Sequence, residues 1–158
     1  MSTLLLFFLL LQIVLLFFIT LHDWIHIPPL IDIKELEKHH SKKERLITST
    51  IFFFIVFIPL ALTWMYRTDL SLWVLININS FYGFLTLGTI LSWWIPYLFG
   101  SSAEHKQAFA EYKNTHHFLS ARGDNVVPNT FHVIMHLQIW ACFAVSAFLL
   151  VQHLSCTI

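Results

Sequence analysis

The sequence predicts an all-α integral membrane protein, a bundle of four transmembrane helices with two short cytoplasmic interfacial helices. Long apolar runs cover residues 2–21, 46–66, 72–97 and 130–154. Each run is long enough to cross a hydrocarbon core of about 30 Å at about 1.5 Å per residue. Charged residues make up only 11% of the chain, whereas a soluble domain carries about 25%. The spans leave no room for a separate soluble domain, so we expect one domain over residues 1–158.

The first apolar run, residues 2–21, is expected to be a retained transmembrane helix rather than a signal peptide. It has no basic region before it, and no small-residue cleavage motif follows it. It is also longer than the apolar part of a typical signal peptide. Pro28 and Pro29 cannot continue a helix, so this helix is expected to end at or before Ile27.

The segment after the first span predicts a short interfacial helix. Asp32 with Glu35 three residues later matches a capping box, and the following residues place apolar side chains on one face and lysines on the other. The second span carries Pro59 near its middle, which predicts a kink. The turn at residues 67–69 between it and the third span is very short, so these two helices should form a tight antiparallel hairpin.

The third span contains polar and small residues that predict contacts between helices. Asn77 and Asn79 are expected to hydrogen-bond to neighbouring helices. Gly83 and Gly88 lack side chains and are therefore expected to allow a neighbouring helix to approach closely.

The second polar segment follows the third span and ends at the fourth. Ser101 with Glu104 repeats the capping-box pattern and predicts the second interfacial helix. Pro128 and Asn129 are typical of a helix start, because proline is favoured in a first turn and asparagine is a good cap. We therefore expect the fourth span to begin at about residue 130.

The basic residues predict which side of the membrane each loop occupies. Eight of the nine lysines and arginines lie in the polar segments 23–45 and 101–129, and only Arg67 lies on the opposite side. Cytoplasmic loops carry an excess of such residues, so we expect both polar loops to be cytoplasmic and both termini outside. The formal net charge is zero, which leaves no basic surface for a nucleic acid.

Two histidine pairs have identical spacing and are expected at the same depth. His22 and His26 stand at the inner end of the first helix, and His132 and His136 at the start of the fourth. Residues at i and i+4 share a helix face, so each pair can present two imidazoles to one ion. The first helix runs inward and the fourth runs outward. Asp23 lies between the first pair, where it can ligate or orient an imidazole.

Histidine doublets occur in both polar segments, at 39–40 and 116–117. Imidazole ligands suit zinc and iron, so the expected cofactor is a divalent metal. The expected ligands are His22, His26, His132, His136, His116 and His117, with Asp23 and Asp124 as the catalytic carboxylates.

This arrangement resembles the histidine-box membrane hydroxylases and desaturases in spacing and topology. Those proteins hold two irons on cytosolic histidine clusters beside a lipid-accessible pocket. Their doublets are usually preceded by another histidine two or three residues earlier, where this chain has Leu36 and Glu37, or Lys113 and Asn114. The resemblance therefore does not extend to a full eight-histidine di-iron site.

Haem is a competing cofactor. Bis-imidazole ligation needs one histidine from each of two facing helices, and His26 with His132 or His136 would supply this. Haem-binding bundles usually place the macrocycle deeper between the helices than these interfacial histidines lie. A non-haem metal is therefore the favoured cofactor.

The leading functional hypothesis is a membrane enzyme with a metal at the cytoplasmic interface, an oxidoreductase or hydrolase that acts on a lipid or another apolar substrate. Imidazoles titrate near neutral pH, so one alternative is a non-catalytic lipid-binding or pH-sensing protein. Another is a small structural subunit of a homo-oligomer or larger membrane complex, because the 16 phenylalanines need apolar neighbours, either lipid or protein.

Overall fold

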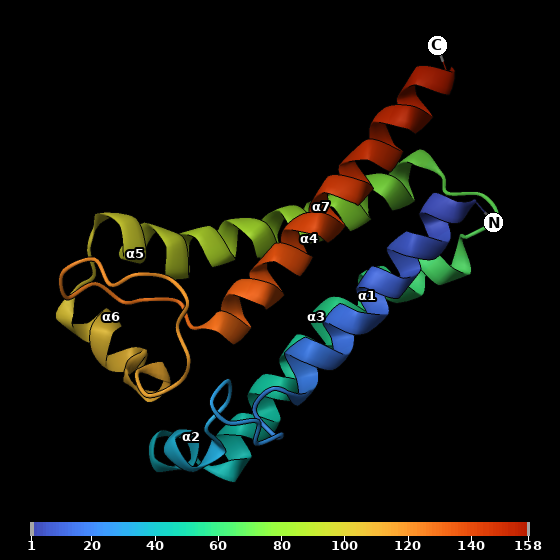
Figure 1. Cartoon of the computed structure of the whole chain (residues 1–158). Coiled ribbons are helices and arrows are strands. Elements are labelled where there is room, and N and C mark those ends of the chain that lie inside the picture. The colour runs from blue at the N-terminus through green and yellow to red at the C-terminus, as the bar shows by residue number, and fades with distance from the viewer. Residues whose placement is uncertain (1, 158) are drawn as a thin grey trace.

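The computed structural model describes residues 2–157, and these residues form helices and connecting loops without a β-strand. Four helices are long and apolar enough to cross a membrane. They are α1 (Thr3–Leu21), α3 (Lys42–Met65), the continuous helix from α4 (Leu72–Thr89) through η1 (Ile90–Trp94) to α5 (Ile95–Phe99), and α7 (Thr130–Thr157). The all-helical fold with four apolar spans is therefore confirmed, and it is compatible with a multi-pass membrane protein (Figure 1).

The helix α1 packs against both α3 and α7, and α7 also packs extensively against α4. Residues 66–71 join α3 to α4 in a short turn, and these two helices are in contact as expected for a hairpin. Figure 1 shows α1 and α3 running side by side, while α4 crosses α7. Antiparallel contact between α1 and α7 brings the end of the first span next to the start of the last.

Short helices form in both polar segments. In the first, α2 (Ile33–His39) begins after Asp32, whose carboxylate accepts hydrogen bonds from the backbone N–H groups of Lys34 and Glu35. In the second, α6 (Ala103–Ala108) is capped by Ser102 and is followed by the 3₁₀ turn η2 (Ala110–Tyr112). The turn η2 contacts α2, so the two polar segments meet. Their position on a membrane surface and their cytoplasmic side stay predictions.

Polar side chains inside the spans hydrogen-bond between helices. The amide of Asn79 donates to the hydroxyl of Ser146 on α7 at 3.0 Å, as the sequence predicts. Asn77 instead donates to the carbonyl of Trp73 one turn earlier, so its expected contact with another helix was wrong. Deeper in the bundle, the buried Gln12 on α1 donates to Thr63 on α3 at 3.0 Å. Such bonds help to fix helix positions in lipid, where hydrophobic burial does not drive association.

The third span contains a π-helical turn, η1, which the sequence analysis did not anticipate. The N–H of Ile95 donates to the carbonyl of Ile90, five residues earlier, instead of four. Pro96 follows directly and has no N–H to donate, so the regular hydrogen-bond ladder is interrupted at this point. Turns of this kind are rare and occur often at functional sites.

The two glycines of the third span behave differently. A Cβ added to Gly83 would lie 3.3 Å from Cε2 of Phe143 on α7, so this glycine permits the close approach that the sequence predicts. A Cβ added to Gly88 would have no neighbour within 4 Å. The expected packing role of Gly88 was therefore wrong, because this position faces away from the other helices.

We predict that Gly83→Leu lowers the free energy of unfolding by about 1–3 kcal/mol, because a larger side chain overpacks the α4–α7 contact. Thermal or denaturant unfolding in detergent measures this change. Gly88→Leu is the matched control, since it makes the same replacement on the same helix at an exposed position. Equal destabilisation by the two variants would contradict the described α4–α7 packing.

Candidate functional site

The histidines at the ends of α1 and α7 meet. His22 directly follows the last residue of α1, and His132 lies in the first turn of α7. Their ring centroids are 5.9 Å apart in an edge-to-face arrangement. The prediction that the opening and closing spans bring their histidines to the same depth is confirmed for this pair.

His22 forms a buried ion pair with its neighbour in the sequence. Nε2 of His22 lies 3.0 Å from Oδ1 of Asp23, and Nδ1 lies 3.0 Å from the carbonyl oxygen of Ile19. The two side chains are only 11% and 12% exposed. A carbonyl and an ionised carboxylate can only accept hydrogen bonds, so this geometry suits an imidazolium that donates from both ring nitrogens.

A chain of hydrogen bonds fixes the tautomer of His132. The hydroxyl of Thr115 donates to the carbonyl of Tyr112 at 2.6 Å and accepts from the amide nitrogen of Asn129 at 2.9 Å. The amide oxygen of Asn129 is therefore the acceptor that lies 2.7 Å from Nδ1 of His132. Nδ1 must carry a proton in this arrangement, so in the neutral imidazole Nε2 has the lone pair.

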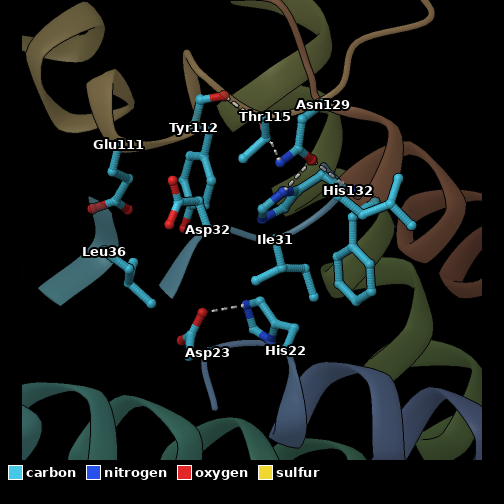
Figure 2. A pocket seen from close by; sticks show the side chains of 12 residues that line it. His22, Asp23, Ile31, Asp32, Leu36, Glu111, Tyr112, Thr115, Asn129 and His132 are labelled. Atoms are coloured by element: carbon cyan, nitrogen blue, oxygen red, sulfur yellow. Dashed lines mark hydrogen bonds and ion pairs between the residues drawn. The ribbon is translucent and has the colours of Figure 1, made fainter. Parts of the chain in front are cut away.

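These groups surround a small cavity, which is shown in Figure 2. Its volume is about 20 Å³, enough for about one water molecule. The loop after α1, the segment around α2, the turn η2 and the start of α7 each contribute side chains to its lining. Figure 2 shows His22 and Asp23 on one side of the cavity, His132 on another, and the acidic side chains of Asp32 and Glu111 opposite His132.

Aromatic rings cover His132 on the side of the third span. The ring of Trp93, which belongs to the π turn η1, stacks on His132 with centroids 4.3 Å apart. The ring of Tyr112 lies 4.6 Å from His132 in a near-perpendicular orientation. The irregular turn therefore supplies a wall of the site, and His132 is only 5% exposed.

The ion pair between His40 and Glu111 joins the two polar segments beside the cavity. Nε2 of His40 lies 2.8 Å from Oε2 of Glu111, whose side chain is 6% exposed. The first histidine doublet thus has one member, His40, that contacts the lining of the cavity. His39 lies 3.6 Å from Glu35 within α2.

His136 is buried one turn further along α7. Its ring centroid is 6.0 Å from that of His132, and it also contacts Trp93 and Trp94. Its Nδ1 is buried without a hydrogen-bond partner among the described residues. The cavity lining includes His132 but does not include His136.

His26 does not join the site. The helix α1 ends at Leu21 and a turn follows, so the expected helical face shared by His22 and His26 does not exist. His26 is exposed. The helix ends six residues before its latest expected limit at Ile27.

The second doublet and Asp124 are held by other partners. Nδ1 of His116 lies 2.7 Å from the hydroxyl of Thr130. His117 directs both ring nitrogens at backbone carbonyls, at 3.0 Å from Tyr112 and 3.3 Å from Pro128. Asp124 is exposed and pairs with Lys106. The structure does not bring Asp124 to the histidines that it was expected to orient.

The described residues contain no group of three or more histidine, cysteine, aspartate or glutamate side chains placed to hold a metal ion. The expected six-histidine ligand set is dispersed over the cavity, the interior of α7, the loop before it and an exposed turn. The divalent metal, like haem, stays a prediction from the sequence.

Sequence reasoning missed the groups that position His132. Asn129 was recognised as a helix cap, and its oxygen does accept from the backbone N–H of His132 at 2.9 Å. Its additional bond to the imidazole ring depends on the direction of the side chain. Thr115 and Tyr112 lie in a polar loop with no recognisable motif, so only the folded structure reveals their part.

No protein-family model, curated protein or solved structure matches the chain.

We predict that Asn129→Leu lowers the free energy of unfolding by about 1–3 kcal/mol, because it leaves buried donors and acceptors without partners. Nitrogen NMR of labelled histidine should also show that His132 no longer has a fixed Nδ1–H tautomer. Asn77→Leu is the control, since Asn77 bonds only to its own helix. An unchanged His132 signal in Asn129→Leu would contradict the assigned hydrogen-bond chain.

We predict that stability falls above about pH 10 in a way that depends on Tyr112. Burial raises the pKa of the Tyr112 hydroxyl well above its ordinary value of 10, and the carboxylates of Glu111 and Asp23 raise it further. The unfolded tyrosine ionises first as the pH rises, so the folded state binds more protons and loses stability.

Tyr112→Phe should therefore lose less stability than the unmodified protein when unfolding is measured on both sides of pH 10. Tyr66→Phe, at the opposite end of α3 from the polar segments, serves as the control. The same alkaline loss in Tyr112→Phe and the unmodified protein would show that Tyr112 is not responsible.

Proposed function

We propose that this protein is a membrane enzyme that hydrolyses a lipid or another apolar ester at one face of the membrane. The reaction centre consists of His132, His22 and Asp23. One observation carries the proposal: Asn129 holds Nδ1 of the buried His132, which leaves Nε2 as the ring nitrogen that can accept a proton, beside a cavity that fits about one water molecule.

The proposed chemistry is general acid–base catalysis by His132. Nε2 of His132 takes a proton from water as the water oxygen bonds to the carbonyl carbon of the ester. The bond from that carbon to the alcohol oxygen then breaks, and the alcohol oxygen receives this proton from Nε2, which restores the starting state. Both ring nitrogens of His22 are engaged, by the carboxylate of Asp23 and by the carbonyl of Ile19, each at 3.0 Å. His22 therefore supplies positive charge beside the developing oxyanion, and Asp23 keeps its ring oriented.

The location of the site favours a substrate from the bilayer. The cavity lies where the apolar spans α1 and α7 end and the charged segments begin. A lipid at the membrane boundary has its ester groups at this depth. The excess of basic residues in both polar segments supports a cytoplasmic position for the site.

A metal-dependent form of this enzyme is a more specific proposal, because it also requires a bound ion. The Nδ1 hydrogen bond to an amide oxygen is the kind of support that metal-ligating histidines have. Since no three ligand side chains converge among the described residues, the mechanism proposed here moves protons only. Elemental analysis of the purified protein decides whether zinc or iron is present.

We predict that His132→Gln abolishes lipid turnover and leaves the helical content unchanged. The purified protein is incubated with total lipid extract in vesicles, and mass spectrometry follows the release of long-chain carboxylates. Loss of the general base should slow turnover by about 10²–10⁴-fold. His26→Gln is the matched control, because His26 lies near the same membrane face but is exposed.

Equal turnover by the unmodified protein and His132→Gln would contradict the proposal. Absence of turnover together with a pH-dependent conformational change would favour the second candidate, a proton-responsive membrane protein. The observation behind that candidate is the His40–Glu111 ion pair, which joins α2 to η2.

A further inference from the structure

A larger pocket lies next to the small cavity, between α6, η2 and the loop that leads to α7. Its volume is about 580 Å³, within the range of pockets that bind small molecules. Residues 106–127 contribute the whole lining, so the pocket belongs to the second polar segment and lies outside the spanning helices. Figure 1 shows α6 and the loop beyond it at the end of the bundle away from both termini.

The lining of this pocket is mainly apolar, although it lies in a charged segment. Its apolar side chains include Phe109, Leu119, Val126 and Val127. An apolar surface of this kind outside the membrane is costly unless something covers it. An aliphatic chain is the kind of ligand that matches such a lining.

Two lysines give the pocket a positive charge. Lys106 and Lys113 both line it, together with one carboxylate, that of Asp124. Asp124 pairs with Lys106. Lys113 is exposed, and it takes part in none of the ion pairs found among the described residues. One ammonium group is therefore available to an anionic ligand.

Tyr112 separates this pocket from the reaction centre. It lines both cavities, and its ring lies 4.6 Å from that of His132. His117 also lines the larger pocket, and its Nε2 contacts the carbonyl oxygen of Tyr112 at 3.0 Å. A chain bound in the larger pocket would therefore lie against Tyr112, whose ring contacts His132.

We propose that the larger pocket binds the acyl chain of a singly charged anionic lipid, with the negative group near Lys113. This inference rests on the proposed function, because it names the substrate class of that site and assigns the pocket to the acyl part. A long-chain carboxylate, the product of ester hydrolysis, has the same two features and is a suitable probe.

The experiment uses a long-chain fatty acid that carries a photoreactive diazirine, with the full-length protein in neutral detergent. Cross-linked peptides are identified by mass spectrometry. We expect cross-links in residues 106–127, and we expect oleate to compete about tenfold more effectively than oleylamine, which has the opposite charge. Cross-links confined to the apolar spans, or equal competition by the two amphiphiles, would overturn the proposal.

Two variants test the pocket itself. Ala121→Trp fills the pocket from an exposed loop position, and Lys113→Glu reverses the charge at its rim. Each should lower cross-linking by about tenfold. Lys42→Glu is the matched control, since Lys42 is an exposed lysine in the other polar segment. Equal cross-linking in Ala121→Trp, Lys113→Glu and the control variant would overturn the proposal.

The two proposals fail in different ways. His132→Gln should retain cross-linking in residues 106–127 while it loses turnover. Turnover with cross-links only in the spans would overturn the pocket and leave the proposed hydrolase in place. Cross-links in the pocket without turnover of any lipid would support the binding site and overturn the proposed hydrolase.

Discussion

The side chain of Asn129 is the contact on which the site depends most. Its oxygen accepts from the backbone and the ring of His132, and its amide nitrogen donates to Thr115. A single residue therefore starts α7, orients the imidazole and connects the preceding loop. Each hydrogen bond contributes about 0.5–1.5 kcal/mol, but an unpaired buried group costs about 1–3 kcal/mol. The three bonds therefore favour one arrangement strongly over alternatives that satisfy only some of them.

The spanning helices hold this arrangement in place through polar contacts at several depths. Gln12 bonds to Thr63 between α1 and α3, Asn79 bonds to Ser146 between α4 and α7, and Gln138 donates to the carbonyl of Leu11 at 2.9 Å. Apolar side chains gain little by leaving lipid for a protein surface, so specific bonds and close packing decide which helix faces meet. The hydrogen bond from Gln138 joins α7 to α1, the two helices that position His132 and His22.

The hydropathy and charge of the sequence were sufficient to predict the four spans. Three of the four predicted starts lie within one residue of the observed helix, because long apolar runs leave few alternatives. The second span begins earlier than expected, at Lys42, since Ser41 and Glu44 form a capping box that extends α3 into the polar segment. The meeting of His22 with His132 followed from topology alone.

The details of the site could not be predicted, because they depend on where helices end and how side chains turn. A pattern of i and i+4 has meaning only within a helix, and α1 stops one residue before His22. His117 was expected to be a ligand, but the loop places two carbonyl oxygens within reach of its ring. Trp93 reaches His132 from a π turn, and a hydropathy pattern does not reveal such a turn. These features arise from tertiary contacts.

The cavity is lined by polar and charged side chains, whereas the stability of the fold alone would favour apolar ones. Well-packed apolar residues in place of a buried ion pair are often neutral or stabilising. The pair of His22 and Asp23 occupies such a position where the spans end, and the ring of His132 lines the same cavity. The hydrogen bond with Asn129 engages Nδ1 of His132 and leaves Nε2 to the proposed chemistry. This arrangement supports the proposed proton transfer with a small molecule in the cavity.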